Sequence, residues 1–285
     1  MKLSYQIVSP PPDKARDSLS PVVLLHGRMD SKKTWRHLAP QIAEKTGRKV
    51  YCLDARNHGE SPWSNVMDYD ALVQDLQEFL SEQNLNRIII VGHSMGGRTA
   101  MFFALKKPEM VEKLLIEDMV ASCYSSLAKI SVLQMLNLLR QSLHAIPDDA
   151  DELTAKRVVA EYIKSQLPPE VTEKRKSSLF DLDTMPIKRE DNKYKWQANL
   201  DVLEEFLNSD RNNKPMHGIY YGEALFLYGT ESFFNVPDDQ TINHFFPKAV
   251  KVPVQSAGHL VHQDCPDEFV HHVIKFINNG DNNAI

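Results

Sequence analysis

The chain has 285 residues, a formal net charge of −5 and three cysteines. Its mild charge, without a basic block, disfavours nucleic-acid binding, which needs a concentrated positive face. No apolar run approaches the ~18 residues of a membrane span. The cysteines, Cys52, Cys123 and Cys265, are odd in number and widely spaced, which fits a reducing compartment without structural disulfides. Because no cysteine–histidine cluster has metal-ligand spacing, we expect no metal site and no cofactor.

The first 120 residues carry apolar segments in the order that is typical of alternating strands and helices. Short runs rich in β-branched residues predict four strands, at residues 22–25, 49–53, 87–91 and 113–116. The intervals between these runs carry apolar residues at helical spacing. Strands that alternate with helices form a parallel sheet covered on both faces. We therefore predict an α/β fold, with a mostly parallel sheet flanked by helices.

The pattern changes after Asp118, because residues 125 to about 209 predict helices and no strand. Two apolar stripes run along residues 127–139, and a helix that is apolar on two sides is buried on both or lines an apolar pocket. Residues 173–195 are rich in charge, which predicts a mobile, solvated face and leaves a contact surface for a protein partner as the alternative.

Strands resume after this helical insert. Residues 224–228 and 249–254 predict two more strands, and an amphipathic helix at 266–277 closes the chain. We therefore expect a core of residues 1–120 and 218–285, with a helical cap of residues 121–217 inserted after the strand that ends near Asp118.

The most informative stretch is Gly-His-Ser-Met-Gly at residues 92–96, which follows a predicted strand and precedes a predicted helix. A serine on so tight a corner has a strained backbone, and Gly92 and Gly96 remove side chains that would clash. The hydroxyl is thereby exposed at a helix N-terminus, where backbone N–H groups stabilise an oxyanion. The context predicts Ser94 as a nucleophile.

A serine hydroxyl needs a base within hydrogen-bond reach. His259 lies in the loop after the last predicted strand, where the order nucleophile, acid, histidine of α/β-hydrolases puts the base. Three nearby histidines compete with it. His271 and His272 fall within the closing helix, and His262 follows the loop one helical turn late. We predict His259 as the base.

A third residue, a carboxylate, orients the histidine in such a catalytic triad. The residues alone do not decide which carboxylate this is. The usual position is the loop after the strand that ends at Tyr228, but no aspartate occurs there near Ser232. Glu231 is available in that loop. Asp118, at the end of an earlier strand, is an alternative, although an aspartate there is also a common helix cap. Asp201 is a third candidate, or a helix N-terminal charge.

Two backbone N–H groups should form the oxyanion hole. One belongs to Met95, the residue after the nucleophile, and the other to Arg28, the residue after His26-Gly27. A backbone donor tolerates any side chain. Arg28 is nevertheless unusual at the floor of an acyl pocket. Its side chain either points to solvent or attracts an anionic group of the substrate.

These residues resemble those of α/β-hydrolases of the abhydrolase-domain 11 type, found in metazoan mitochondria, and of related bacterial esterases. The shared stretches, above all Asp-Ala-Arg-Asn-His-Gly, are at residues 22–27, 54–62, 91–97, 196–201 and 257–259. The resemblance covers most of the chain. It implies a mitochondrial location, or a cytoplasmic one if no leader has been removed from the chain.

The resemblance also bears on the acid. Similar bacterial esterases take it from the position of Asp118, and metazoan members suggest the position of Asp201. We therefore rank Asp118 first, Asp201 second and Glu231 third. The chain departs from the family pattern at residues 28–30 and 118–121. Both segments line the pocket mouth, so substrate preference does not transfer.

Two functions from different classes follow. The first is a serine hydrolase of carboxylic esters or thioesters with an apolar acyl group, acting through an acyl-enzyme, in lipid metabolism. The second is a binding or regulatory protein on the same scaffold that acts on a metabolic enzyme partner, since fold alone does not fix function.

Overall fold

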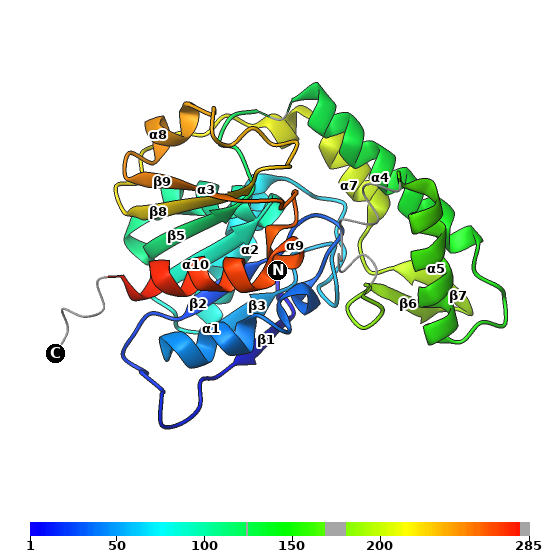
Figure 1. Cartoon of the computed structure of the whole chain (residues 1–285), viewed down its shortest axis with the longest axis horizontal. Coiled ribbons are helices and arrows are strands. Elements are labelled where there is room, and N and C mark those ends of the chain that lie inside the picture. Colours follow the sequence, from blue (N-terminus) through cyan, green and yellow to red (C-terminus); the bar gives the residue numbers. More distant parts are fainter. Residues whose placement is uncertain (124, 169–180, 280–285) are drawn as a thin grey trace.

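The structure is a computed structural model, and it describes residues 1–123, 125–168 and 181–279. A sheet of seven strands forms its centre (Figure 1), in the spatial order β1-β3-β2-β4-β5-β8-β9. The strands are β1 (Tyr5–Val8), β2 (Val22–Leu25), β3 (Val50–Leu53), β4 (Ile88–His93), β5 (Val111–Glu117), β8 (Glu223–Gly229) and β9 (Ala249–Val254). The predicted α/β fold is confirmed.

Neighbouring strands are parallel throughout the sheet, except that β1 runs antiparallel to β3. The sequence analysis did not predict β1. Its residues alternate poorly, and the middle two are exposed, so this edge strand lacks the apolar run that identified the others.

Four long helices cover the sheet: α1 (Ala39–Thr46), α2 (Tyr69–Glu82), α3 (Met95–Lys106) and α10 (Pro266–Asn278). Helices α1 and α10 lie in front of the sheet in Figure 1, and Val22 and Leu24 of β2 point into their cluster. The alternate residues, Val23 and Leu25, pack with α2 and α3 on the other face. Side chains of a strand alternate between faces, so a strand that is apolar at every position is buried on both.

Shorter helices complete the core: η1 (Lys32–Trp35), η2 (Pro108–Met110), α8 (Thr241–Phe245) and α9 (Val261–Asp264). The loop with His259 connects β9 to α9. Among the residues that the structure describes, no helix has the length and apolar character needed to cross a membrane.

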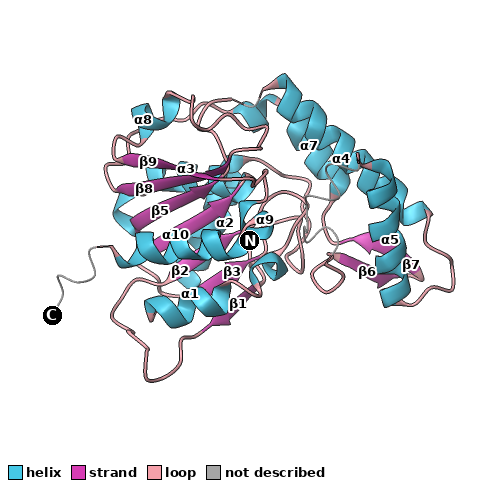
Figure 2. Cartoon of the chain, in the orientation of Figure 1, coloured by secondary structure: helices cyan, strands magenta, loops and turns pink. Residues whose placement is uncertain are grey.

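The elements between β5 and β8 add no strand to the central sheet and lie to one side of it (Figure 2). They are α4 (Ser126–His144), α5 (Glu152–Gln166), β6 (Ile187–Glu190), β7 (Lys193–Trp196), α7 (Leu200–Asn208) and η4 (Asp210–Asn213). We call this segment the cap. Its apolar faces share a cluster with Met95 of α3 and Leu72 of α2. The division at residues 120/121 and 217/218 stays a prediction.

The expectation of a cap without strands was wrong, since β6 and β7 form an antiparallel hairpin. Asp191 and Asn192 connect them, and both have positive φ, 51° and 61°, as a two-residue hairpin turn requires. The strands are rich in Lys, Arg and Glu, which hid the alternation that identifies a strand. Residues 169–180, which include part of the charged segment expected at 173–195, lie outside the described residues.

Candidate active site

Ser94 occupies the corner between β4 and α3, with φ 51° and ψ −114°, a strained conformation for a residue with a side chain. The two flanking glycines leave room for this corner. A Cβ on Gly92 would lie 2.5 Å from the carbonyl oxygen of Gly96, and one on Gly96 would lie 2.4 Å from that of Leu25. Neither contact is tolerated between real atoms, so the turn needs glycine at both positions.

Ser94, His259 and Asp118 form one hydrogen-bonded chain. His259 Nε2 is 3.0 Å from Ser94 Oγ, and His259 Nδ1 is 2.7 Å from Asp118 Oδ2. The Asp118 side chain is fully buried, and His259 is largely buried. A carboxylate on Nδ1 fixes the ring so that Nε2 faces the hydroxyl, which is the arrangement that general-base activation of a serine requires.

Asp118 directly follows β5 and has a left-handed backbone, with φ 46°. Its N–H donates to the carbonyl oxygen of Leu227, and the Gly229 N–H donates to its Oδ1 at 3.0 Å. The Ser232 hydroxyl donates to its Oδ2. The sequence analysis had noted Ser232 only as the place where an acid was missing. No motif pointed to its hydroxyl as a ligand of the carboxylate.

The other two acid candidates lie elsewhere. Asp201 is on the exposed side of α7, where its carboxylate is 2.8 Å from the guanidinium of Arg140 and its side chain is 90% exposed. Glu231 is exposed in the loop after β8. The two ring nitrogens of His259 face Asp118 and Ser94 instead.

The two predicted oxyanion donors come from different segments of the chain, and their role stays a prediction. Met95 is the first residue of α3. Gly27, which precedes Arg28, packs so closely that a Cβ there would lie 3.4 Å from Ser94 Cβ. Of the two orientations considered for the Arg28 side chain, the one toward solvent was wrong, because Arg28 is only 9% exposed.

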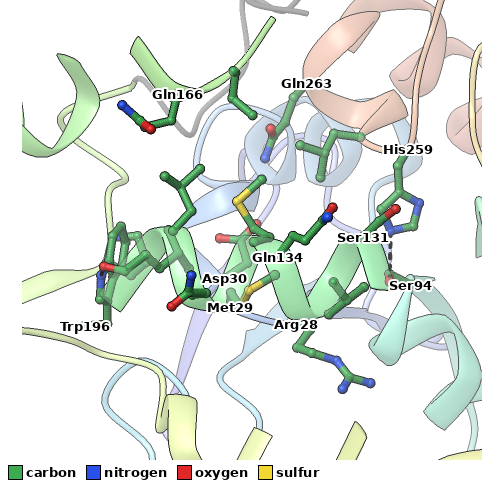
Figure 3. A pocket seen from close by; sticks show the side chains of 18 of the residues that line it. Arg28, Met29, Asp30, Ser94, Ser131, Gln134, Gln166, Trp196, His259 and Gln263 are labelled. Atoms are coloured by element: carbon green, nitrogen blue, oxygen red, sulfur yellow. Dashed lines mark hydrogen bonds between the residues drawn. The ribbon is translucent and has the colours of Figure 1, made fainter. Parts of the chain in front are cut away.

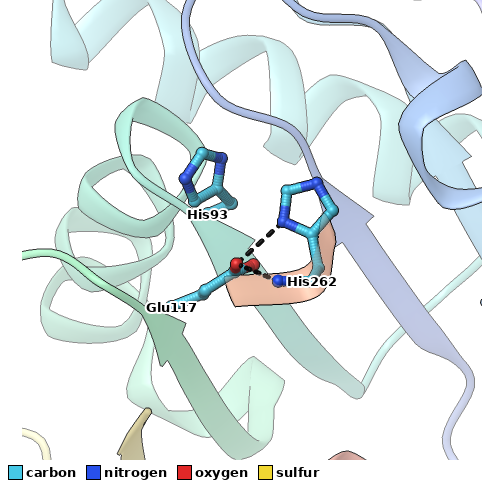
Figure 4. A group of neighbouring side chains, drawn as sticks. All are labelled: His93, Glu117 and His262. Atoms are coloured by element: carbon cyan, nitrogen blue, oxygen red, sulfur yellow. Dashed lines mark hydrogen bonds and ion pairs between the residues drawn. The ribbon is translucent and has the colours of Figure 1, made fainter. Parts of the chain in front are cut away.

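His93, Glu117 and His262 form a second buried group (Figure 4). The ring centres of His93 and His259 are 4.7 Å apart. Glu117 Oε1 accepts hydrogen bonds from the backbone N–H of His262 at 2.8 Å and from its Nδ1 at 2.7 Å. On its other side, His262 Nε2 is 2.9 Å from the hydroxyl of Thr34. Burial alone would lower the pKa of His262, but the adjacent Glu117 carboxylate outweighs burial and raises it.

His93 has the opposite character. Burial, and then the charges of His259 and His262, hold its pKa well below the usual value. A neutral His93 donates from Nε2 to the carbonyl oxygen of His259, 3.0 Å away. This hydrogen bond ties the backbone of the predicted base to the residue that precedes the predicted nucleophile.

The ligand atoms of His93, Glu117 and His262 lie within 4.8 Å of one another, a spacing that could hold a metal ion. The sequence did not suggest this group, because its members are far apart in the chain. Oε1 of Glu117 already accepts two hydrogen bonds from His262, whereas Oε2 of Glu117 is buried without a hydrogen-bond partner. We interpret the group as a buried, hydrogen-bonded His262–Glu117 pair beside the loop with His259.

A pocket of about 670 Å³ opens at Ser94 and His259 and extends beneath the cap. In Figure 3, Ser94 and His259 lie at one side of this pocket, and Trp196 and Gln166 lie at the other. Apolar side chains supply much of its wall, among them Met29, Met135, Leu138, Leu139, Met185, Trp196, Phe233 and Phe234. Helix α4 also presents amides to the pocket, from Gln134, Asn137 and Gln141.

The sequence profile of the family described as alpha/beta hydrolase fold matches residues 20–265. This chain belongs to the α/β-hydrolase fold family. The resemblance found in the sequence is thereby confirmed, and the matched residues include Ser94, Asp118 and His259 as well as the cap.

Relatives in this family carry several names. The chain is 31% identical to the "sn-1-specific diacylglycerol lipase ABHD11" of Danio rerio, over 90% of this chain and 78% of that protein. It is 30% identical to "Ethanol acetyltransferase 1" of Cyberlindnera fabianii, over 90% and 79% of the two chains. Among solved structures, a "Marine microorganism esterase" superposes with a TM-score of 0.79 at 27% identity, covering 96% of this chain and 99% of the other.

Proposed function

We propose that this chain is a serine hydrolase that cleaves carboxylic esters or thioesters with an apolar acyl group. The observation that carries the proposal is the chain of hydrogen bonds from Ser94 Oγ to His259 Nε2 and from His259 Nδ1 to Asp118. Membership of the α/β-hydrolase family, with relatives named as lipase and esterase, makes the chain a carboxylic ester hydrolase.

Acylation follows from this geometry. Ser94 Oγ attacks the carbonyl carbon while His259 Nε2 accepts its proton, and the imidazolium is stabilised by the Asp118 carboxylate. The N–H groups of Met95 and Arg28 then hold the oxyanion, at the N-terminus of α3 and beside Gly27. His259 returns the proton to the leaving alcohol or thiol, and the acyl group stays on Ser94.

Deacylation repeats these steps with water as the nucleophile. An alcohol in place of water would transfer the acyl group instead, and a relative of similar identity is named an acetyltransferase. Assays in which ethanol replaces part of the water separate the two outcomes. We expect free acid to remain the main product, and an excess of ethyl ester would make the chain an acyltransferase.

The apolar wall of the pocket supports an apolar acyl group. Burial of a methylene group contributes about 0.8 kcal/mol, so each methylene of the substrate that fits the pocket should raise kcat/KM up to about fourfold. A series of p-nitrophenyl esters and acyl-CoA thioesters of increasing length measures this dependence. A flat series would contradict an apolar acyl site.

A fluorophosphonate probe tests the nucleophile. We expect it to label the wild-type chain and not Ser94→Ala, while Ser165→Ala, at an exposed serine of α5, is labelled normally. If Ser94→Ala is labelled equally, Ser94 is not the nucleophile. If no variant is labelled or cleaves any ester, a binding or regulatory role toward a protein partner is the better hypothesis.

The resemblance also implies a mitochondrial location, which we include in the proposal. Fractionation of cells that produce the chain from its own gene tests it. Recovery of the protein outside mitochondria would refute this part and leave the catalytic proposal intact.

A further inference from the structure

Arg28 is the only lysine or arginine among the described residues that line the pocket. It follows Gly27, which packs against the nucleophile turn. In Figure 3, Arg28 lies on the same side of the pocket as Ser94, away from Trp196 and Gln166. The chain thus places a permanently charged residue in the wall of the pocket, on the side of the nucleophile.

The cap holds the guanidinium of Arg28 in place with uncharged groups. Its Nη2 donates to Oδ1 of Asn212 at 3.1 Å, and its central carbon lies 5.4 Å from the ring centre of Phe206. Asn212, in η4, is itself buried. These contacts orient the guanidinium without neutralising it.

No described carboxylate forms an ion pair with Arg28, and its Nη1 is buried without a hydrogen-bond partner. Asp30, two residues along the same loop, is occupied elsewhere, since its Oδ1 accepts from the backbone N–H of Ser31. A buried charge without a counter-ion is expensive unless something compensates it. Nη1 therefore lacks the partner that an anion bound against the Arg28 wall of the pocket would supply.

The histidines near Arg28 do not supply that anion. His58, which is fully buried, has its pKa lowered well below the usual value by burial first, then by His26, and also by the charge of Arg28. His26 packs against it, with the two ring centres 5.1 Å apart. The surroundings of Arg28 on this side are thus imidazoles rather than carboxylates.

We propose that Arg28 binds an anionic group of the substrate, a carboxylate or a phosphate carried by the ester or thioester. Guanidinium groups pair with both anions through strong, charge-assisted hydrogen bonds. Arg28 would then select among substrates through its side chain, while its backbone N–H serves the oxyanion. This inference rests on the proposed esterase function and narrows its substrate class.

Two matched pairs of substrates test the proposal and locate the charge. In the first pair, p-nitrophenyl hemisuccinate is compared with its methyl ester, so the charge is on the acyl group. In the second, 1-butyrylglycerol 3-phosphate is compared with 1-butyrylglycerol, so the charge is on the leaving group. We expect wild-type kcat/KM to favour the anionic member of at least one pair.

Arg28→Gln retains the backbone N–H but removes the charge. We expect it to lower kcat/KM for the favoured anionic ester about tenfold to a hundredfold, mainly through KM, because a hydrogen bond to a charged group is lost. For the neutral ester, kcat/KM should change less than about threefold. Arg211→Gln, at an exposed ion pair with Glu205, should leave both substrates unchanged.

Asn212→Asp supplies the missing carboxylate beside the guanidinium with almost no change in shape. We expect this internal counter-ion to lower kcat/KM for the anionic ester as Arg28→Gln does, although Arg28 is still present.

The proposal is overturned if wild-type enzyme prefers the neutral member of both pairs. It is also overturned if Arg28→Gln lowers kcat/KM equally for both members of a pair, since that result indicates a packing role for the Arg28 side chain. Failure of the esterase proposal itself is distinct, because then the fluorophosphonate probe does not label Ser94 and neither member of a pair is cleaved.

Discussion

The hydroxyl of Ser232 donates a hydrogen bond to Asp118 Oδ2, the same oxygen that lies 2.7 Å from His259 Nδ1. Asp118 follows β5 and Ser232 follows β8. These strands are parallel neighbours, with Glu117 at the end of β5 in register with Leu227 of β8. The carboxyl ends of parallel strands meet at one edge of a sheet. An acid after β5 therefore reaches the same imidazole as an acid after β8, and the β8 loop keeps a supporting hydroxyl.

We predict that Ser232→Ala lowers kcat about tenfold and leaves KM unchanged. The variant removes one of the donors that hold the Asp118 carboxylate, which corresponds to about 1.4 kcal/mol. Steady-state kinetics with a short-chain p-nitrophenyl ester measures the effect. Ser232→Thr, which restores a hydroxyl, should recover most of the activity, and a fully active alanine variant would show that the hydroxyl is dispensable.

Replacement of the acid candidates should separate them. Asp118→Asn places an amide against His259 Nδ1 and favours the wrong tautomer, so we expect kcat to fall about 10³- to 10⁴-fold. Asp201→Asn breaks only an exposed ion pair with Arg140, which is worth about 1 kcal/mol of stability or less, and should leave kcat near the wild-type value. The reverse result would make Asp201 the acid.

The sequence was sufficient for the parts of the molecule that local physics dictates. A β-branched run before Gly-x-Ser-x-Gly predicts a strand and a sharp turn, and the structure has β4 and Ser94 there. The hairpin of β6 and β7 was missed because its strands pair with each other outside the main core, and their charged residues obscure the apolar alternation.

Contacts between distant segments could not be predicted in the same way. Ser232 meets Asp118, and Glu117 meets His262, only because β5, β8 and the loop after β9 converge at one end of the sheet. Nothing in the local sequence distinguishes Glu117 from any other strand-end glutamate. Its buried partner is defined by the fold.

The Glu117–His262 pair should make stability depend on pH. The pKa of His262 is raised in the folded state above its ordinary value of 6.5, so the pair stabilises the fold fully below pH 6.5. This contribution is lost as the pH rises through the folded pKa.

Glu117→Gln should remove this dependence, because burial alone lowers the pKa of His262. We expect the variant to be less stable by about 3 kcal/mol at pH 6, the typical cost of breaking a buried pair, with a smaller deficit at pH 9. Urea unfolding at the two pH values measures it. An identical deficit at both pH values would mean that His262 is not protonated in the fold.

The three cysteines should differ in their reaction with a thiol reagent such as dithionitrobenzoate. Burial, and then the charge of Asp54, raise the pKa of Cys52 to about 12, so its thiolate is scarce and shielded in the folded chain. Burial, followed by the Glu268 carboxylate, also raises the pKa of Cys265, which is partly exposed.

Cys123 is exposed, and we therefore expect one fast phase at pH 8 from this residue. A slower phase should come from Cys265, and Cys52 should react only after unfolding in guanidinium chloride. Cys123→Ser should abolish the fast phase, and Cys52→Ser should leave the native time course unchanged. A fast phase that survives Cys123→Ser would mean that a second thiol reacts rapidly in the folded chain. This result would contradict either the burial of Cys52 or the raised pKa of Cys265.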